Sequence, residues 1–350
     1  MNILCLSLSA FDKVGGIQTF NKYFYKGLSE NKISYKVISL HDFKAPNNDV
    51  LVCDSNYLKF IYFLFKYSNS ETTIIWQHIT LTVFLPFLNF FKKIKTNILV
   101  LYGTEVWGKK LSSLKKIGLM KMDSYWCISN YTSKLIFTKF KIPKTKIKIL
   151  PCCINIPISL KLNNSPYNID QINILSILRL DKSGKLNAVF DMLSVLPILK
   201  KKYHNIHYTI IGEGNFKTQI IKIIKKKKLE NYVSILGYVK DTMPYLEHCD
   251  IFTLTSPLEG FGIVYLEAML FKKPCISSKN CGSEDVVINE KTGYSIDIDD
   301  HKKLVKILKK IIDNKSLRSK LGKNGYDHLV KNFTFTKFKE NQFKNLLNTK

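Results

Sequence analysis

The sequence predicts an α/β protein with two domains, each built around a parallel sheet, that face each other across a cleft. Short apolar runs rich in β-branched residues alternate with longer helical patterns, which is typical of strand-helix-strand units. This series occurs twice, before and after a linker near residues 155–171 that contains Pro166. The length of 350 residues also exceeds that of one average domain.

The expected elements follow the chain in this order. The strands of the first series are 3–8, 36–40, 50–53, 73–76, 97–101 and 124–128, and those of the second are 172–178, 207–211, 233–236, 251–255 and 274–277. Helices are expected at 17–29, 132–140, 186–202, 216–228 and 302–312. The expected domains are 1–158 and 159–330, followed by a final helix at 331–350 with aromatic residues at helical intervals.

The chain is strongly basic, with 54 Lys and Arg against 27 Asp and Glu, a net charge of 54 − 27 = +27. This excess favours anionic partners, although genome composition explains it equally well. We expect no nucleic-acid partner, because basic residues are not interleaved with aromatic ones in a recognised motif. The absence of G-x-G-x-x-G after the first strand argues against a dinucleotide-dependent dehydrogenase.

The eight scattered cysteines indicate buried thiols in a reducing cytoplasm. The first residues are expected to form a strand and not a signal peptide. The apolar stretch 79–91 is too short to span a bilayer and is interrupted by Pro86. Because lysines at 92, 93 and 95 follow it, it fits either a core helix with a solvated basic end or a contact with an anionic membrane. The predicted location is cytoplasmic, with peripheral attachment to the inner membrane face left open.

Three segments are candidates for chemistry, and all follow predicted strands. Gly15-Gly16 precedes a helix, where close backbone approach and free amides attract a phosphate. Arg179 lies after the first strand of the second domain, with Lys182 and Lys185 as alternative phosphate ligands; Lys185 is preferred because a helix follows it. The third segment runs from Ser256 to Met269 and places Glu267 about two turns into a mainly apolar helix.

This third segment carries a family resemblance. Glu259 and Glu267 enclose Gly260-Phe261-Gly262, and Glu-Ala-Met closes the run, which resembles the signature of retaining glycosyltransferase family 4, the glycogen-synthase-like group. Further positions that match this family in order are Gly15-Gly16, Gly103-Thr104-Glu105, Ser129 with Tyr131-Thr132, Leu150-Pro151, Arg179-Leu180, Gly212-Glu213-Gly214 and Gly282-Ser283-Glu284. The resemblance implies the GT-B fold, two facing Rossmann-like domains, with a last helix that crosses back to the first.

The resemblance also implies site roles. Arg179, Lys185 and Glu259 would be catalytic, with the two cations neutralising the leaving diphosphate and Glu259 beside the transferred sugar. Glu267 would hold the ribose. The other donor-binding positions would be Gly15, Gly16, Gly212, Gly214, Val239, Gly260, Phe261, Gly262, Ile263 and Val264.

The sequence departs from the family at one important position. The family has a sugar-contacting His before its first-domain Gly-x-Glu, whereas this chain has Tyr102-Gly103-Thr104-Glu105. Tyr102 and Glu105 are therefore candidates for the acceptor or sugar side, and His78 is a further one. A lone His after a strand is also commonly an ordinary packed residue.

The function that follows is transfer of a hexose-type sugar, with retention, from a nucleotide diphosphate sugar to a glycan or lipid-linked glycan of a surface polysaccharide or lipopolysaccharide. A UDP- or GDP-sugar is the expected co-substrate, without cofactor or metal. Two alternatives are a nucleotide-sugar 2-epimerase of the same fold and a non-catalytic basic protein that binds membranes or nucleic acid. The pair Glu259 and Glu267 with its Gly-Phe-Gly insert favours transfer over epimerisation.

Overall fold

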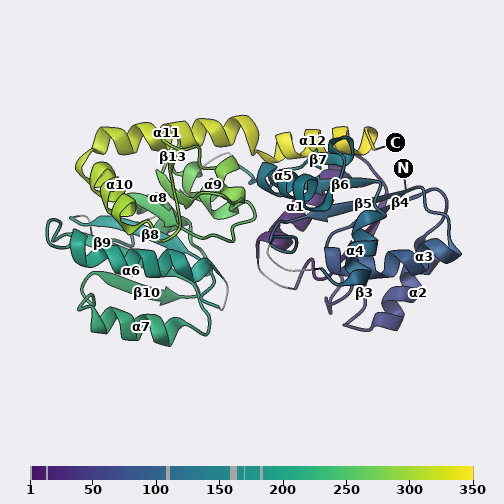
Figure 1. Ribbon diagram of the computed structural model, residues 1–350, viewed down its shortest axis with the longest axis horizontal. Helices are drawn as coiled ribbons and strands as arrows, with labels where there is room; N and C mark the ends of the chain where they lie inside the picture. Colours follow the sequence, from purple (N-terminus) through teal and green to yellow (C-terminus); the bar gives the residue numbers. More distant parts are fainter. Residues whose placement is uncertain are drawn as a thin grey trace. The chain divides into compact units, whose positions relative to one another are not determined.

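The chain forms two compact units in the computed structural model (Figure 1), which describes residues 2–12, 15–107, 111–157, 164–168, 170–181 and 184–349. Unit 1 comprises Met1–Cys153 and Phe335–Lys350, and unit 2 comprises Ile154–Thr334. Each unit has its own parallel sheet and core, so the expectation of two α/β domains is confirmed.

Unit 1 is built on a parallel sheet with the strand order β3-β2-β1-β4-β5-β6-β7. Its strands are β1 (Asn2–Ser7), β2 (Tyr35–Ser39), β3 (Val50–Val52), β4 (Thr72–Trp76), β5 (Thr96–Leu101), β6 (Ser124–Cys127) and β7 (Ile147–Ile149). Every residue of β4 and β5 is buried, as expected for central strands covered on both faces. The chain moves outward from β1 in both directions, so β1 and β4 flank the point where the strand order reverses.

Unit 1 has six described α-helices, and two of them begin at a capping side chain. The six helices are α1 (Gly16–Glu30), α2 (Tyr57–Tyr67), α3 (Leu85–Phe91), α4 (Ser113–Met120), α5 (Asn130–Phe140) and α12 (Phe335–Leu347), with the 3-10 turns η1 (Ile79–Phe84) and η2 (Lys144–Lys146). Asn56 caps α2 and Ser129 caps α5, each by accepting a hydrogen bond from the amide three residues on.

Unit 2 repeats the plan with the strand order β10-β9-β8-β11-β12-β13. Its strands are β8 (Ile172–Ile177), β9 (Ile206–Ile211), β10 (Val233–Gly237), β11 (Ile251–Leu254), β12 (Cys275–Ser278) and β13 (Gly293–Ile296). Its helices are α6 (Asn187–Leu199), α7 (Lys217–Lys226), α8 (Met243–His248), α9 (Ile263–Leu270), α10 (His301–Asp313) and α11 (Lys315–Asn332), with the 3-10 turns η3 (Gly184–Leu186) and η4 (Gly282–Asp285). Here β8 and β11 flank the reversal of strand order.

The unit boundaries lie a few residues from the expected ones. Unit 2 begins at Ile154 and not at 159, because Ile154 forms a parallel bridge with Thr334 and its amide donates to the carbonyl of Phe333. The expected single helix at 331–350 is also wrong at its start. Helix α11 ends at Asn332 and α12 begins at Phe335. The two residues between them, Phe333 and Thr334, are those that contact Ile154.

The last helix, α12, completes the core of unit 1 by packing on α1. The rings of Phe338 and Phe20 pack edge to face with their centroids 5.5 Å apart. The side-chain amide of Gln342 donates a hydrogen bond to the backbone carbonyl of Phe24 at 2.9 Å. A Cβ on Gly27 would lie 2.2 Å from the Gln342 side-chain oxygen, so a larger residue there would displace the Gln342 side chain. Helix α12 is therefore an integral part of unit 1.

Other expectations of the sequence can be compared with the described residues. All eight cysteines are free and buried, as expected. The stretch 79–91 is not one core helix: it forms η1 and then the short α3, whose Phe90 is 82% exposed. No helix within the described residues combines the length and the apolar character that crossing a bilayer requires.

We predict that Phe338→Ala lowers the free energy of unfolding by about 3–5 kcal/mol, because it leaves a cavity between α12 and α1. The matched control on the same helix is Phe343→Ala, since Phe343 is 41% exposed whereas Phe338 is 2% exposed. Chemical denaturation would measure both variants. Equal stability of the two would contradict the role assigned to α12.

Candidate active site

The candidate site in unit 2 lies at the carboxyl ends of its parallel strands. Lys185 follows β8, Gly212 follows β9, Val239 follows β10, and Glu259 follows β11. Because β8 and β11 are neighbours on either side of the reversal of strand order, their loops border the crevice where open α/β sheets bind ligands. The sheet thus brings the sequence-predicted residues of unit 2 to one edge.

The centre of this edge is an ion pair between the loops after β8 and β11. The ammonium nitrogen of Lys185 lies 2.8 Å from a carboxylate oxygen of Glu259, whose side chain is only 9% exposed. The two loops also touch beside this pair, where a Cβ on Gly184 would lie 2.7 Å from the Leu258 side chain. A nearly buried carboxylate is thereby compensated by a cation that remains partly accessible. Lys182, the alternative phosphate ligand, falls outside the described residues.

The turn Gly260-Phe261-Gly262 presents backbone and not side chains to the sheet edge. Gly262 precedes α9 with a φ of +91°, a conformation that favours glycine. A Cβ on Gly282 would lie 1.8 Å from the carbonyl oxygen of Gly260, and the amide of Gly282 donates to the Glu259 carbonyl at 2.8 Å. The Phe261 ring is buried against Phe333, so this residue anchors the turn and only its backbone can meet a ligand.

Helix α9 begins directly after this turn, which corrects the expected depth of Glu267. The helix starts at Ile263, so Glu267 lies one turn inside it and not two, since the turn accounts for the first residues after Glu259. Burial raises the pKa of Glu267. The first amides of α9, at Ile263 and Val264, have no acceptor within the helix and are suited to an anion.

Arg179, by contrast, is directed to solvent in this structure. Its side chain is 77% exposed and forms an ion pair with Asp181. Its loop is nevertheless fixed, because Leu178 and Leu180 donate backbone hydrogen bonds to Ile211 and Glu213 on either side of it. Arg179 therefore stands at the sheet edge, exposed and paired with Asp181.

The presence of glycine at positions 212 and 214 has a structural reason. Cβ atoms there would lie 1.7 Å from the Leu178 carbonyl oxygen and 2.1 Å from that of Leu180. Both residues also have a positive φ. They hold the loop after β9 against the loop after β8, while Val239, which is partly exposed, follows β10 beside them.

Gly15 and Gly16 lie at the start of α1, after β1 in unit 1. Gly15 is the N-cap residue and has an extended backbone, and Gly16 is the first residue of the helix. No side chain caps this helix within the described residues, so its first amides are open. The position fits the predicted phosphate contact.

The loop that leads to these glycines is held by Asp42, a residue that sequence reasoning missed. Its carboxylate accepts hydrogen bonds from the hydroxyls of Ser9 (2.6 Å) and Ser39 (2.8 Å) and from the amide of Ala10 (2.7 Å). The amides of Phe11 and Asp12 also donate to it. Burial alone would raise the pKa of Asp42, but these hydrogen bonds outweigh it and the pKa is lowered. No sequence motif marks this residue, because all of these partners except Ser39 lie 30 to 33 positions away.

His78 follows β4, the strand next to β1, and caps η1. Its Nδ1 accepts a hydrogen bond from the Thr80 amide at 3.1 Å, so a neutral ring carries its proton on Nε2. Burial, with a smaller contribution from the nearby Lys115, lowers the pKa of His78 to about 4. The imidazole is therefore neutral at pH 7 and can donate but not act as a cation.

Tyr102 and Glu105, the other residues expected on the acceptor or sugar side, have structural partners. The Tyr102 hydroxyl is buried and donates to Asn21 at 2.8 Å. The Glu105 carboxylate accepts the amide of Tyr102 at 2.6 Å. Burial raises the pKa of Glu105, although backbone hydrogen bonds partly offset this. Glu105 thus stabilises the turn after β5, and Tyr102 ties this turn to α1. His78 and Glu105 are each partly exposed, whereas Tyr102 is buried.

The described residues also contain a group with the spacing of a metal site, formed by Asp191, Asp299 and His301. Their ligand atoms lie within 4.8 Å of one another. Asp191, however, accepts a hydrogen bond from Thr255 at 2.7 Å and contacts His301 at 3.0 Å. The two carboxylate oxygens of Asp191 are thus occupied by Thr255 and His301. The first contact also holds Thr255 at the end of β11, next to the candidate site.

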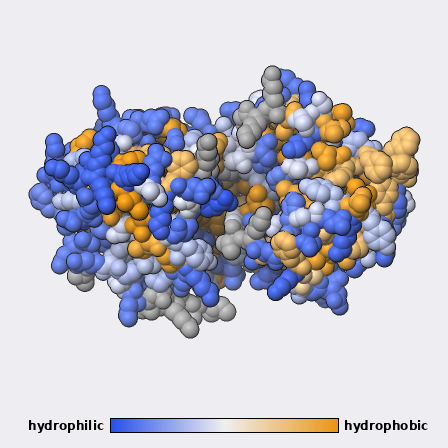
Figure 2. All heavy atoms as spheres, turned by 90° about the horizontal axis from the view of Figure 1, so that it is seen from below, coloured by the Kyte–Doolittle hydropathy of each residue, from blue (hydrophilic) through white to orange (hydrophobic). Residues whose placement is uncertain are grey.

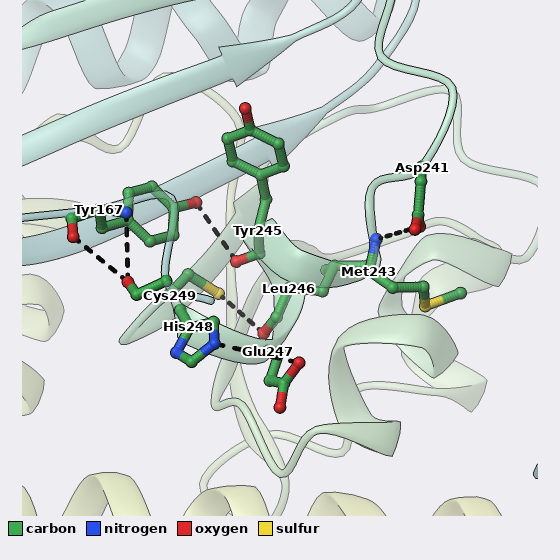
Figure 3. Close-up of polar contacts among 9 residues, drawn as sticks. Tyr167, Asp241, Met243, Tyr245, Leu246, Glu247, His248 and Cys249 are labelled. Atoms are coloured by element: carbon green, nitrogen blue, oxygen red, sulfur yellow. Dashed lines mark hydrogen bonds and ion pairs between the residues drawn. The ribbon is translucent and has the colours of Figure 1, made fainter. Parts of the chain in front are cut away.

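A cavity of about 130 Å³ lies away from the carboxyl ends of the unit 2 strands. It is lined by His207 and Thr209 of β9 and by Ser234 of β10. Figure 3 shows its border, where Tyr167 and Tyr245 meet. Their rings pack edge to face at 5.8 Å, and the Tyr167 hydroxyl donates to the Tyr245 carbonyl at 3.3 Å. These contacts attach the segment before β8 to α8.

The chain thus has two parallel α/β units, and in unit 2 charged side chains and glycine turns gather at the strand ends. The structure of a glycosyltransferase from Rickettsia africae has a TM-score of 0.75 at 16% identity, covering 99% of this chain and 97% of that one. The structure of Anabaena HepE in complex with UDP has a TM-score of 0.77 at 16% identity, covering 99% and 100%. The fold of the chain is therefore GT-B.

Sequence comparison is more specific for unit 2. Residues 165–328, which lie within unit 2, match the family model for glycosyl transferases group 1. A poly(ribitol-phosphate) alpha-N-acetylglucosaminyltransferase of Staphylococcus aureus is 25% identical over 176 residues, which is 50% of this chain and 35% of that protein.

A second relative comes from Campylobacter jejuni. It is an N-acetylgalactosamine-N,N'-diacetylbacillosaminyl-diphospho-undecaprenol 4-alpha-N-acetylgalactosaminyltransferase, 28% identical over 175 residues, which is 50% of this chain and 46% of that protein. The chain thus spans about a third to a half of the length of the curated relatives it matches.

We predict that Asp42→Asn lowers the free energy of unfolding by about 1–3 kcal/mol at pH 7, because an amide cannot accept from so many donors. The pKa of Asp42 is lower in the folded state than in the unfolded state. The Asp42 carboxylate therefore stabilises the folded protein fully above the unfolded-state pKa, and this stabilisation is lost as the pH falls through the folded-state pKa. The difference from wild type should therefore shrink below about pH 4. Asp49→Asn, which changes an exposed carboxylate, is the control; denaturation at several pH values would measure both.

Proposed function

We propose that this protein is a glycosyltransferase that moves a hexose-type sugar from a nucleotide diphosphate sugar to a glycan or lipid-linked glycan. The observation that carries the proposal is the Lys185–Glu259 ion pair at the reversal of strand order in unit 2, beside the open amides of α9. The match of residues 165–328 to the family model for glycosyl transferases group 1 also supports sugar transfer.

The chemical difficulty of the reaction is the negative charge on the departing diphosphate, which the cations of unit 2 would stabilise. Lys185 is held in place by Glu259, whereas Arg179 must turn from Asp181 toward the donor. The amides of Ile263 and Val264 would add fixed dipoles. This supply of positive charge supports a transfer that needs no metal ion.

Further donor contacts would fix the sugar and the nucleoside. Glu259 would lie beside the transferred sugar, and Glu267, one turn into α9, would accept hydrogen bonds from the ribose hydroxyls. The strand-end loops at Gly212–Gly214 and Val239 would border the base. A carboxylate whose pKa is raised by burial gains most from such donors, because they replace its lost water.

Donor and acceptor classes follow from the relatives. The HepE structure holds UDP, which supports a UDP-sugar over a GDP-sugar. The Campylobacter relative is named for a lipid-linked acceptor and the Staphylococcus relative for a poly(ribitol-phosphate) acceptor. We therefore propose a role in surface polysaccharide or lipopolysaccharide assembly at the cytoplasmic face of an anionic membrane, with retention of the anomeric configuration as the family resemblance implies. Proton NMR of the product would reveal its anomeric configuration.

The first experiment is thermal unfolding with UDP, GDP, ADP, CMP and dTDP, each with and without EDTA. A ligand that binds only the folded state raises the melting temperature, by mass action. We expect UDP to raise it, with EDTA having no effect. No shift with any nucleotide would overturn the donor site, and a shift abolished by EDTA would overturn the metal-free mechanism.

We predict that Lys185→Gln lowers turnover about 100-fold or more, because it removes a charge that the transition state needs. It should also destabilise the protein, because Glu259 is left nearly buried without its cation. The double variant Lys185→Gln/Glu259→Gln should recover stability but not activity. Lys202→Gln is the control, since it breaks an exposed ion pair of the same length, 2.8 Å, with Asp313.

Two outcomes would contradict this assignment. Activity restored in the double variant would show that Lys185 acts only on stability. Conversion of the donor sugar to an epimer without any acceptor would show that the enzyme is an epimerase.

A further inference from the structure

Helices α2 and α3 of unit 1 lie side by side and form one aromatic surface. The ammonium group of Lys92 donates to the Phe65 and Ser68 carbonyls, at 2.7 and 2.8 Å, and so ties the end of α3 to the end of α2. The Phe65 ring lies 5.5 Å from that of Phe87 and 6.1 Å from that of Phe91. The two helices are therefore held as a single platform.

The platform exposes large apolar side chains. Leu58 is 79% exposed and Phe90 is 82% exposed, and Tyr57, Tyr62, Phe87 and Phe91 are each more than half exposed. Figure 2 shows hydrophobic side chains gathered at the right-hand end, on the unit 1 part of the molecule. Six such residues on two neighbouring helices exceed the scattered apolar exposure of an ordinary surface, so an apolar partner is expected.

The charge around the platform has one sign. Between residues 56 and 95 the sequence has five basic residues, Lys59, Lys66, Lys92, Lys93 and Lys95, but a single acidic one, Glu71. Glu71 is itself paired with Lys95 at 3.8 Å. The partner must therefore combine an apolar interior with a negatively charged surface.

We propose that the α2–α3 platform docks on an anionic lipid bilayer. Leu58 and Phe90 would enter the boundary between headgroups and acyl chains, while Lys66 and Lys93 contact lipid phosphates. This proposal rests on the proposed function in one respect: a lipid-linked acceptor explains why a glycosyltransferase would need such a contact. The binding itself requires no substrate.

The same charges argue against a second copy of the chain as the occupant. Two identical platforms placed face to face would bring lysines of both copies together without acidic residues to compensate them. With a net charge of +27, the whole chain would add to that repulsion. An anionic bilayer, by contrast, satisfies both the aromatic and the basic residues.

The test is flotation of the full chain with vesicles of phosphatidylcholine, alone or with 30% phosphatidylglycerol (about the charge density of an anionic leaflet). We expect binding only to the anionic vesicles and loss of binding in high salt. Leu58→Ser/Phe90→Ser should weaken binding at least about 10-fold, since each substitution removes an exposed side chain that enters the lipid. Lys66→Gln/Lys93→Gln should weaken it by a similar factor.

Matched controls lie outside the platform. Ile198→Ser/Phe343→Ser changes two exposed apolar residues, and Lys225→Gln/Lys226→Gln changes two exposed lysines of the equally basic helix α7. Both control variants should bind vesicles as wild type does. Thermal stabilisation by UDP should be the same in all of these variants, which separates failure of the docking surface from failure of the donor site.

Three results would overturn the proposal. The first is a wild-type chain that does not float with anionic vesicles, and the second is binding of the platform variants that equals that of the controls. The third result is a dimer, seen by light scattering, that dissociates on Leu58→Ser/Phe90→Ser, because it would assign the platform to a second copy.

Discussion

The site in unit 2 depends on places where one backbone segment lies directly on another, with no space for a side chain. Gly212 and Gly214 bring the loop after β9 onto the carbonyls of Leu178 and Leu180, and Gly282 brings the turn after β12 onto Gly260. Hydrogen bonds between the same segments fix their spacing. Loops at neighbouring strand ends therefore behave as one rigid layer, on which the charged side chains stand.

This layer explains how a nearly buried carboxylate can be maintained at the sheet edge. Glu259 loses most of its water, so it requires a compensating cation, and the fixed loop after β8 supplies Lys185 at 2.8 Å. The cation in turn is partly exposed and can meet an incoming anion. Arg179 differs because its side chain is largely exposed and its partner is the nearby Asp181. One cation is thus held by a nearly buried carboxylate, while the other stands in solvent.

The sequence was sufficient to predict the fold class and most strands, because their apolar runs are long and fully buried. It did not predict the short edge strands β7 and β13, although it predicted β3, another edge strand of three residues. Helix α2 was missed because YLKFIYFLFKY has aromatic residues on nearly every face. Helix α11 contains Gly322 and Gly325, which weaken a helical pattern.

The site residues were predictable as positions along the chain but not in their exposure. Phe261 and Tyr102 lie within motifs that indicate ligand contact, yet their side chains are buried by Phe333 and Asn21, which are distant in sequence. Asp42 shows the opposite case. No motif surrounds it, and its importance comes from hydrogen bonds to a loop about 30 residues away. Such partners are set by tertiary structure, which a single sequence does not display.

The division of the chain also has a consequence for biosynthesis. Unit 2 is continuous from Ile154 to Thr334, whereas unit 1 requires α12, which the ribosome releases after all of unit 2. Unit 2 can therefore fold during translation while unit 1 still exposes the apolar surface of α1 that α12 will cover. Unit 1 is therefore completed only after unit 2 has been made, and until then its uncovered apolar surface is open to aggregation.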